Sequence, residues 1–529
     1  MRGLIWTVFF LLIGCGASPQ NALRDNEAAG DDALTAADNV EVFDEGPGED
    51  ETLPEADILS PDDDFYPLEN PRMLADLVPG EKSCTRLRTA VQDGRLFVAC
   101  EVPGDDLRLW YTPEPGGEQL QEIHFWEGTD DAALLPAEHG LFIHLGTELW
   151  FFSPGTEELT LLHSFTDEVY SFNSTLAIDR TLYFQGGATS SDNELWRSDG
   201  TMEGTVKIRD LAPGTTVNGQ RYLTFWRGEE TARGRHEFYF VTYSNRGRML
   251  YRSNGTEAGT IPLPGILPND PGRGGVGTHF RVGDRDYFFA PYSPEASAEG
   301  EGFLVFPQSF DLFSTDLTAE GTVLMQKWGA QGSIYNAVRY SYLCNTAARA
   351  YFKVSSYRIE LTYWPSPAYP PTYTPVFVSD TLYAVEESGE IVTIPTGTEP
   401  LSGAVCDSAT GRLYFLKDDY FLDYVPDGER RWYSFSRGSI AILPVGDRVL
   451  TANDYLSYEI GRELFIVDVK KSSHHDVADI CLGPCGSNPG DFSRYRDGVL
   501  FRADKLLFGR ELWFHDPTRP VTAPWLFEP

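Results

Sequence analysis

The chain has 529 residues and a formal net charge of −37, with 79 acidic against 42 basic side chains. A chain this acidic is repelled by phosphate backbones and by anionic lipid, which argues against nucleic-acid binding and against electrostatic binding to a membrane surface. Its length exceeds what one hydrophobic core supports, so it requires several domains or a repeat.

The first fifteen residues match a bacterial lipoprotein signal. Arg2 supplies a positive start, residues 4–13 are apolar, and the sequence from Leu12 to Cys15 matches the lipobox that precedes lipidation. The apolar run is about half of the roughly 20 residues that cross a bilayer as a helix. We therefore expect residues 1–14 to be a cleaved signal peptide and Cys15 to carry a lipid. Gly16 replaces the aspartate that commonly retains lipoproteins in the inner membrane, which favours the outer membrane, at its periplasmic face or at the cell surface.

Residues 15–64 form a second region with a different composition. Between Pro19 and Asp64 there are sixteen acidic residues and one basic residue, Arg24, with almost no aromatics. Such a segment cannot bury enough apolar area to offset its ordering entropy. The sequence therefore predicts a disordered acidic linker, followed by one folded domain over residues 65–529.

Six cysteines follow Cys15, an even number that suits the oxidising periplasm or cell surface. Their spacing predicts three disulfides, Cys84–Cys100, Cys344–Cys406 and Cys481–Cys485, among fifteen connectivities. A zinc site is the alternative for Cys481 and Cys485, but no second metal-type pair accompanies them. We expect no metal site.

A strand of apolar and aromatic residues that ends in a turn recurs along the folded domain. The copies are ELWFFSPGT at Glu148, ELWRSDGTMEGT at Glu194, MLYRSNGTEAGT at Met249, DLFSTDLTAEGT at Asp311, ELFIVD at Glu463 and ELWFHD at Glu511. A second short strand precedes them, as in TLYFQG at Thr181 and RLYFLK at Arg412. The dipeptides Asp199-Gly200 and Asn254-Gly255 predict two-residue hairpin turns with positive φ.

The spacing of these units predicts the fold class. One leucine in each unit recurs at intervals of about 40 to 70 residues, and four short strands in about 40 to 50 residues are typical of propeller blades. The leucines are Leu109, Leu149, Leu195, Leu250, Leu312, Leu382, Leu422, Leu464 and Leu512. The expected fold is an all-β propeller of four-stranded blades, seven to nine in number, with eight or nine the best count.

Closure of the ring gives an independent prediction. The last unit ends its third strand at ELWFHD and then enters a Pro-rich tail, so its fourth strand is missing. The segment Asp76–Gly80 nearly repeats Asp210–Gly214, which follows a fourth strand. We therefore expect an N-terminal strand to complete the last blade and to leave no exposed sheet edge.

Three segments, Glu194–Gly214, Met249–Thr260 and Asp479–Trp513, resemble the ELWxxDGT repeat family of bacterial secreted and surface proteins. That resemblance implies a propeller-like repeat fold and an exported location, and it implies no chemistry. The unit LYAVEESGEIVTI from Leu382 is similar to the repeats of quinoprotein-like propellers. A single copy without a cofactor motif predicts a blade and no cofactor.

The binding surface is predicted from insertions. The longest repeat intervals, which end at Leu250, Leu312 and Leu382, are expected to hold their extra residues between second and third strands, on one face of the ring over blades four to six. Ser293–Gln308 and Ser355–Asp380 are two of these insertions. The second contains Trp364, Tyr369 and Tyr373 among prolines, which hold large, rigid contact groups extended. These three residues are the candidate partner-binding residues. The alternative is that the segment only packs over its own blades.

Catalytic signals are weak, and no catalytic residue is assigned. The pair His474-His475 with Asp476 suggests a metal or acid–base site, but neighbouring side chains on a strand point to opposite faces, so a solvated strand end is favoured. The leading hypothesis is a monomeric, non-enzymatic, lipid-anchored scaffold or binding module for a protein or polysaccharide partner. Two alternatives are a glycan hydrolase or lyase with its site at the central channel and a structural envelope component.

Overall fold

The computed structural model describes Pro71–Pro517, apart from gaps in the connections between strands. The gaps are 76, 78–83, 103–105, 129–131, 166–173, 188–192, 212–221, 232–234, 245–246, 269–277, 293–308, 330–335, 347, 364–371, 395–400, 408–410, 418–419, 425–430, 435–441, 446–447, 455–461, 469–474, 479, 481–485 and 506–508. None of the residues within the described ranges forms a helix long and apolar enough to span a membrane.

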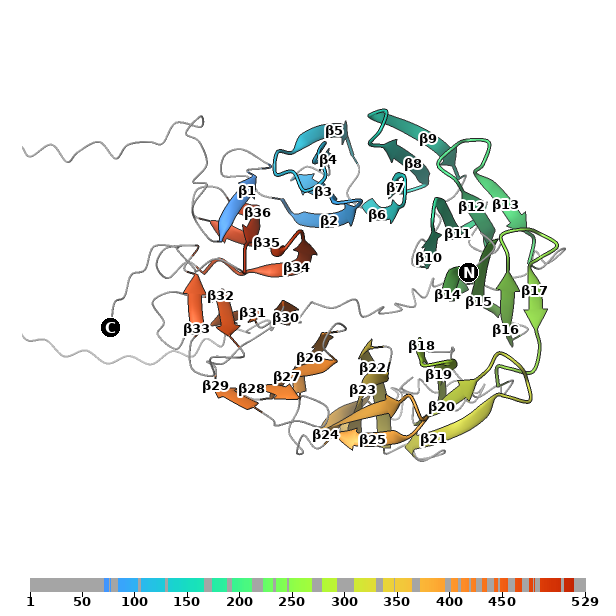
Figure 1. The fold of residues 1–529 in the computed structure, drawn as a ribbon. Helices are drawn as coiled ribbons and strands as arrows, with labels where there is room; N and C mark the ends of the chain where they lie inside the picture. The colour runs from blue at the N-terminus through green and yellow to red at the C-terminus, as the bar shows by residue number, and fades with distance from the viewer. Residues whose placement is uncertain are drawn as a thin grey trace, which may run out of the picture. The chain divides into compact units, whose positions relative to one another are not determined.

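The strands of the described residues pair into nine antiparallel four-stranded sheets, which we number blades 1 to 9 in chain order (Figure 1). This is an all-β propeller, as the repeat predicts, and nine blades is the upper end of the predicted range. In Figure 1 the first strand of each blade lies innermost, and first strands of neighbouring blades contact one another, as β2 does β6.

Blades 1 to 3 contain β2 (Arg86–Gln92), β3 (Arg95–Val102), β4 (Asp106–Tyr111), β5 (Gln121–Trp126); β6 (Ala132–Ala137), β7 (Gly140–Leu145), β8 (Glu148–Ser153), β9 (Glu158–Ser164); and β10 (Thr175–Ile178), β11 (Thr181–Gly187), β12 (Asn193–Ser198), β13 (Val206–Arg209). Blades 4 to 6 contain β14 (Tyr222–Thr231), β15 (Arg235–Ser244), β16 (Gly247–Ser253), β17 (Ile261–Leu263); β18 (His279–Val282), β19 (Arg285–Tyr292), β20 (Ser309–Thr315), β21 (Val323–Gly329); and β22 (Asn336–Asn345), β23 (Arg349–Tyr363), β24 (Thr372–Glu386), β25 (Ile391–Ile394). Blades 7 to 9 contain β26 (Leu401–Asp407), β27 (Arg412–Lys417), β28 (Tyr420–Tyr424), β29 (Arg431–Ser434); β30 (Ile442–Val445), β31 (Arg448–Asp454), β32 (Arg462–Asp468), β33 (His475–Ala478); and β34 (Gly490–Tyr495), β35 (Gly498–Lys505), β36 (Gly509–His515) with β1 (Arg72–Ala75).

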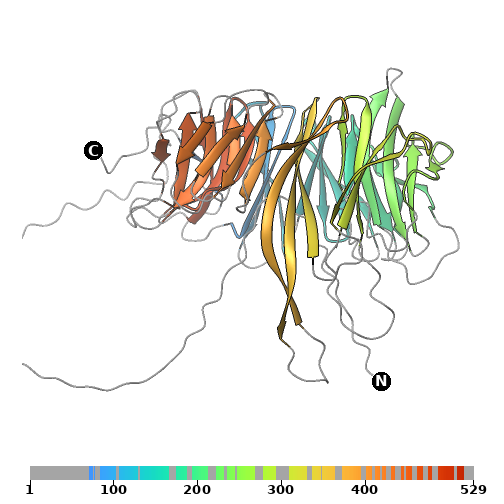
Figure 2. The same ribbon diagram turned by 90° about the horizontal axis from the view of Figure 1, so that it is seen from below.

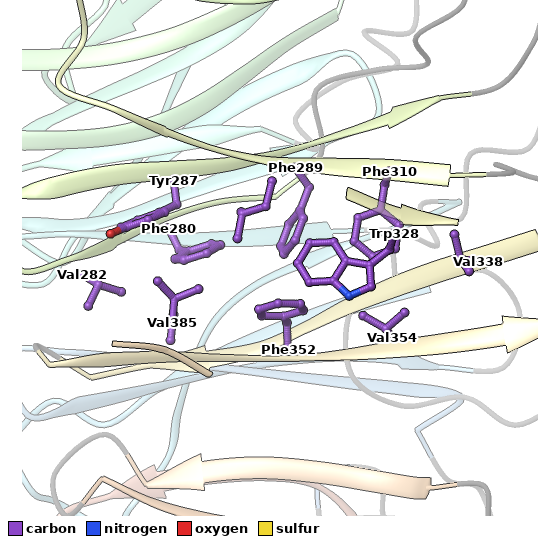
Figure 3. Close-up of a cluster of buried hydrophobic side chains, with 12 residues drawn as sticks. Phe280, Val282, Tyr287, Phe289, Phe310, Trp328, Val338, Phe352, Val354 and Val385 are labelled. Atoms are coloured by element: carbon purple, nitrogen blue, oxygen red, sulfur yellow. The ribbon is translucent and has the colours of Figure 1, made fainter. Parts of the chain in front are cut away.

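Apolar side chains of the second and third strands form the core. The nine repeat leucines all lie in the third strand of their blades, and each one whose side chain is described is at most 1 % exposed. The buried clusters join successive blades. Between blades 5 and 6, Phe289, Phe310 and Trp328 face Phe352 and Val354 (Figure 3). Because no sheet can bury both of its faces alone, each blade depends on its neighbours for stability.

The ring closes through the N-terminal strand. Strand β1 pairs antiparallel with β36, with Arg72 opposite Phe514 and Met73 opposite Trp513. A buried cluster then packs Leu87 of blade 1 against Leu512 of blade 9. The predicted closure is confirmed, and β1 covers what would otherwise be an open sheet edge.

A buried glutamate near the start of the third strand accepts a hydrogen bond from an amide just after the fourth strand in several blades. Oε2 of Glu194, which is 1 % exposed, accepts the amide hydrogen of Leu211 at 2.6 Å. Glu463 accepts that of Ile480 at 3.0 Å in the same way. These contacts explain why a glutamate precedes the Leu-Trp or Leu-Phe pair: its carboxylate satisfies a buried amide where the chain leaves the blade.

The turn after β12 is closed by its own side chains. Oδ1 of Asp199 accepts hydrogen bonds from the amide and the hydroxyl of Thr201, at 3.0 and 2.7 Å. A β-carbon at Gly204 would lie 2.0 Å from that oxygen, so the turn requires glycine there. The prediction of a two-residue hairpin turn is wrong, because residues 199–205 separate the strands and only Gly200 of the pair has positive φ.

The same turn recurs in blades 4 and 5. Asn254 binds Thr256, and Asp316 binds Thr318, through equivalent hydrogen bonds. Blade 5 keeps this turn although Leu317, with φ of +68°, occupies the glycine position. That backbone conformation is rare for a leucine. The Leu317 side chain packs against the core between blades 4 and 5, and this burial offsets the strain.

Two of the three predicted disulfides are confirmed. Cys84 is bonded to Cys100 within blade 1, and Cys344 is bonded to Cys406, which joins the first strands of blades 6 and 7. Cys481 and Cys485 lie outside the described residues, as do Cys15 and residues 1–64.

The insertions follow the prediction in two blades of three. In blade 5 the segment 293–308 lies between β19 and β20, and in blade 6 the segment 364–371 lies between β23 and β24. In blade 4 the prediction is wrong, since only residues 245–246 separate β15 from β16. There the added length lies in the longer strands β14 and β15 and in the connection from β13 to β14. The connection from β13 to β14 emerges on the expected face, whereas the extension of β14 and β15 at their own turn, where Thr231 pairs with Arg235, lies on the opposite face.

Candidate functional site

A pocket of about 400 Å³ lies against the inner strands of blades 9, 1 and 2, where the ring closes. Its lining residues are Leu87, Arg88, Thr89, Ala133, Leu134, Asp491, Phe492, Phe501, Arg502 and Leu512. The pocket is therefore assembled from both ends of the propeller sequence. Sequence reasoning placed a potential site at the central channel but named none of these residues.

A β-bulge in β34 shapes one wall of the pocket. Gly490 lies opposite Arg502 and Ser493 lies opposite Leu500, so the two residues between Gly490 and Ser493 face only one on β35. Both residues of the bulge, Asp491 and Phe492, line the pocket. Asp491 has φ of +53°, a left-handed conformation that non-glycine residues seldom adopt. Bulges and strained residues of this kind occur preferentially beside functional sites.

The polar side of the pocket is held by an ion pair. Nε of Arg502 lies 2.9 Å from Oδ2 of Asp491, with the two side chains 31 % and 52 % exposed. A β-carbon at Gly490 would lie 3.3 Å from the same nitrogen, so the glycine lets the guanidinium lie flat across the strand. The hydroxyl groups of Thr89 and Ser493 lie 3.3 Å apart and join blade 1 to blade 9 beside this pair.

The pocket does not provide the constellation that a glycan hydrolase needs. Hydrolysis by two carboxylates requires a pair across the scissile bond. Asp491 is the one carboxylate among the lining residues, and its partner is a guanidinium rather than a second acid. Over the described ranges as a whole, no three His, Cys, Asp or Glu side chains gather as a metal site.

A chain of polar contacts between blades 3 and 4 resembles a proton relay. His236 lies 3.1 Å from Asp179 through Nε2 and 2.5 Å from the Tyr183 hydroxyl through Nδ1. Tyr183 is 2 % exposed, and burial raises its pKa to about 12. A β-carbon at Gly255 would lie 2.6 Å from its hydroxyl oxygen, so the turn of blade 4 covers the tyrosine. The contacts therefore join blade 3 to blade 4.

The repeated turns serve the same purpose. Arg197 of blade 3 donates to the carbonyl oxygen of Gly255 in the turn of blade 4 at 3.1 Å. Arg209, from the outer strand of blade 3, donates to the carbonyl oxygens of Glu257 and Thr260 in the same turn. The turn in the repeat motif is thus a contact between successive blades.

The hairpin of β23 and β24 is the second candidate site. Its ladder runs from Arg349 opposite Glu386 to Tyr363 opposite Thr372, whereas the pairing of β22 with β23 stops at Arg358. On the other side, β25 pairs only with residues 382–385. The far part of the hairpin is therefore a two-stranded arm, which reaches past the ends of the neighbouring strands in Figure 2.

The described side chains at the base of the arm are partly apolar. Tyr357 and Phe377 pack edge to face, with ring centroids 6.0 Å apart, and the Arg339 guanidinium lies over Tyr357 at 5.5 Å. Val378 is 54 % exposed, at a register shift between the two strands. Pro375 lies in β24 two residues before Phe377, opposite Ile359. These residues stiffen the arm and present contact area along it.

Of the three predicted partner-binding residues, the structure describes only the backbone of Tyr373. Tyr373 lies in β24 opposite Leu361, but its side chain is outside the described residues. Trp364 and Tyr369 lie in the segment 364–371 between the strands, also outside them. The strands on either side place both ends of that segment together, since Tyr363 pairs with Thr372.

No known protein family and no curated protein matches this chain. Solved structures similar to it include a eukaryotic initiation factor, at TM-score 0.45 and 10 % identity over 78 % of this chain and 90 % of that one. Sqt1 of Saccharomyces cerevisiae is similar at a TM-score of 0.35 and 9 % sequence identity, over 85 % of this chain and 99 % of that one. The WD40 domain of SCAP from fission yeast is similar at a TM-score of 0.37 and 10 % sequence identity, over 84 % of this chain and 94 % of that one. Scores this low carry no functional argument, and the propeller assignment rests on the strand pairing.

Proposed function

We propose that this protein is a lipid-anchored propeller of the outer membrane that binds a protein or polysaccharide partner through the arm of β23 and β24, without catalysis. The observation that carries the proposal is the continuation of the β23–β24 ladder beyond both flanking strands, from Ile359 to Tyr363. A blade needs no such extension to close its own core, so the arm is available for contact with another molecule.

The chemistry of the arm favours recognition by side chains. The outer edge of β24 carries Pro375 and the bulge at Val378, which both oppose the addition of a further strand. Trp364, Tyr369 and Tyr373 would then supply the contact area at the end of the arm, because aromatic residues give large rigid surfaces at low entropic cost. The monomeric state and the lipid on Cys15 belong to the same proposal.

Crosslinking in cells tests the arm. A photo-reactive amino acid at Val378 is expected to capture a partner, and one at Phe125, which is 36 % exposed on blade 1, serves as the matched control. Capture should disappear when Trp364, Tyr369 and Tyr373 are all replaced by alanine, while the melting temperature stays unchanged. Equal capture at both positions, or loss of stability in the triple variant, would favour the alternative that the segment packs over its own blades.

A polysaccharide partner is distinguished by a separate measurement. Co-sedimentation of the purified protein with isolated envelope polysaccharide should depend on the same three aromatic residues. Membrane attachment is tested by replacing Cys15 with serine, which should move the protein from the outer-membrane fraction to the soluble fraction. Retention of that variant in the membrane would reject the lipid anchor and leave the role of the arm to be judged by crosslinking.

A further inference from the structure

We propose that Asn254 is a modification site controlled by the fold, at which the side-chain amide is converted to an acid when the contact between blades 3 and 4 opens. An asparagine followed by glycine deamidates readily in a flexible chain, because glycine has no side chain to hinder attack by its own nitrogen. The chain contains this dipeptide at Asn254-Gly255, in the turn after β16, and at Asn218-Gly219, which lies outside the described residues. The site is independent of the arm, which belongs to blade 6.

The reaction uses the backbone nitrogen of the glycine. After a base has removed its proton, this nitrogen bonds to Cγ of the asparagine, and the Cγ–Nδ2 bond breaks to release ammonia, which takes up a proton. Water then opens the cyclic imide. Cleavage of the new bond gives aspartate, and cleavage of the original peptide bond gives isoaspartate, in which the backbone runs through Cγ. Water is the co-reactant, and nothing is oxidised or reduced.

The folded turn keeps this nitrogen away from a base. Gly255 is buried, and its amide donates a hydrogen bond of 3.1 Å to Oγ of Ser253, which is fully buried as well. Oγ of Ser253 lies 2.7 Å from Oγ1 of Thr260, whose own hydroxyl donates to the carbonyl oxygen of Thr256. The Ser253 hydroxyl therefore donates to Thr260, and its oxygen accepts the hydrogen of the Gly255 amide.

The side chain of Asn254 is held in place although the residue is exposed. Its Oδ1 accepts the amide hydrogen of Thr256 at 3.1 Å and the Thr256 hydroxyl at 2.6 Å. A β-carbon at Gly259 would lie 1.8 Å from this oxygen, so the backbone packs closely against the carboxamide. Any movement of Cγ relative to the Gly255 nitrogen therefore requires these hydrogen bonds to break.

Blade 3 covers the turn and acts as the gate of the site. A β-carbon at Gly255 would lie 2.6 Å from the Tyr183 hydroxyl oxygen, and Arg197 donates to the Gly255 carbonyl oxygen at 3.1 Å. A base reaches the Gly255 amide after Tyr183 and Arg197 have separated from the turn. Local openings of this kind cost less free energy than global unfolding. Conversion of Asn254 therefore records how often this contact opens in the folded protein.

The two products should affect the contact between the blades differently. Aspartate already occupies this position of the turn in blades 3 and 5, where Asp199 and Asp316 accept the same pair of hydrogen bonds. Isoaspartate adds a methylene group to the backbone, and we expect it to displace Gly255 from Ser253 and from Arg197. Formation of isoaspartate should therefore weaken the contact between blades 3 and 4 permanently.

Mass spectrometry of the full chain tests the gate. The purified protein is kept at mildly alkaline pH, and the fraction of Asn254 converted to acid is followed in protease digests, in buffer and in guanidinium chloride that unfolds the ring. We expect conversion in buffer to be slower by about tenfold or more. Conversion of Asn218 in the unfolded sample shows that the solution supports the reaction. Equal rates for Asn254 in buffer and in denaturant would overturn the proposal.

Two arginine variants test whether blade 3 is the gate. Arg197→Ala removes the donor to the Gly255 carbonyl oxygen and should speed conversion of Asn254 in buffer by about fivefold, the effect of one hydrogen bond. The matched control, Arg252→Ala, removes an exposed arginine two positions before Asn254 and should leave the rate unchanged. Each variant is measured well below its own melting temperature. No acceleration in Arg197→Ala, or the same acceleration in Arg252→Ala, would show that blade 3 does not control the site.

The consequence of the reaction is tested with its products. Asn254→Asp should keep the melting temperature of the unmodified protein. The isoaspartyl form is prepared by prolonged ageing of Asn218→Gln, in which Asn254-Gly255 is the remaining Asn-Gly pair, and it should melt at a lower temperature. An equal fall in Asn254→Asp and in the aged protein would contradict the distinction between the two products.

Discussion

The amide of Leu77 donates a hydrogen bond of 2.8 Å to Oε2 of Glu511, across 434 positions of sequence. The amide of Leu211 makes the same contact with Glu194 inside blade 3. The two ends of the propeller thus reproduce a contact that an ordinary blade makes within one continuous segment. Closure of the ring uses the interactions of the repeat itself.

Replacing Glu511 with alanine should therefore weaken the closure of the ring. Its side chain is fully buried, so the Leu77 amide would lose its acceptor, at a cost of about 1 to 3 kcal/mol in the free energy of unfolding. Urea denaturation measures this loss. Glu148→Ala, at a half-buried glutamate that opens the third strand of blade 2, should cost less.

A chain lacking residues 1–83 should show the same defect more strongly, because β36 then becomes an exposed edge. A synthetic peptide of residues 69–80 should restore part of the stability when added in excess. If the shortened chain were as stable as the full chain and stayed monomeric, β1 would not be the closing strand.

The turn after β12 gives a second prediction. Gly204→Ala places a β-carbon 2.0 Å from Oδ1 of Asp199, and we expect a loss of about 1 to 3 kcal/mol in unfolding free energy from this overlap. Gly155→Ala is the matched control, since nothing lies within 4 Å of its added carbon. Combining Gly204→Ala with Asp199→Ala should cost less than the sum of the single changes. If the losses of the two single variants simply added in the double variant, the predicted overlap between residue 204 and Asp199 would be contradicted.

The two disulfides should differ in their response to reductant. Cys84 and Cys100 are fully buried, whereas the side chains of Cys344 and Cys406 are half-buried. A mild thiol should therefore reduce the Cys344–Cys406 bond first, because exchange requires access of a thiolate. Alkylation followed by mass spectrometry would report the order, and earlier labelling of Cys84 would show the expectation to be wrong.

Removing each disulfide should also destabilise the fold to a different extent. The Cys344–Cys406 bond closes a longer loop, with a separation of 62 residues against 16. From the chain entropy of the unfolded state, removing Cys344–Cys406 should lower the free energy of unfolding by about 4 kcal/mol, and removing Cys84–Cys100 by about 3 kcal/mol. Paired alanine variants, compared by urea denaturation, would measure both.

Acid should destabilise the last blade. His515 is fully buried at the end of β36, and burial lowers its pKa to about 4 from the ordinary value of 6.5. The unfolded chain therefore binds a proton at a higher pH than the folded chain does. The neutral histidine makes its full contribution to the free energy of unfolding above about pH 6.5. As the pH falls toward 4, the free energy of unfolding should decrease by about 3 kcal/mol.

The dependence of unfolding free energy on pH measures this effect. His515→Leu should flatten the curve between about pH 6.5 and pH 4. Burial also lowers the pKa of His139 and of His163, so a smaller slope of the same sign should remain. An unchanged curve in the variant would show that His515 does not contribute.

The repeat made the fold predictable because each blade repeats one pattern of burial. A leucine in every third strand and an aromatic pair in most second strands fixed the strands and their order, and the near-repeat of the segment at Asp76 indicated closure. The turn type was not predictable from Asp199-Gly200 alone. It depends on Thr201 and Gly204, which act through side-chain hydrogen bonds that a dipeptide does not encode.

The pocket was not predictable for a different reason. The segment GDFSRY of β34 has the composition of an ordinary strand, and nothing in it indicates that Asp491 adopts a left-handed conformation. Its partner Arg502 and the lining residue Arg88 belong to segments at opposite ends of the propeller sequence. Only the closing of the ring brings them together, so the site follows from the fold and not from any local motif.

Strand β1 has four residues, and every residue upstream of it is joined to the propeller through them. A force that pulls on the chain from its N-terminal side would act first on these few lateral hydrogen bonds and on the Glu511 contact. The strand would peel away one pair at a time while the eight complete sheets keep their own pairing. The closing strand is therefore the joint of the ring that carries such a load first, and its detachment would expose the edge of β36.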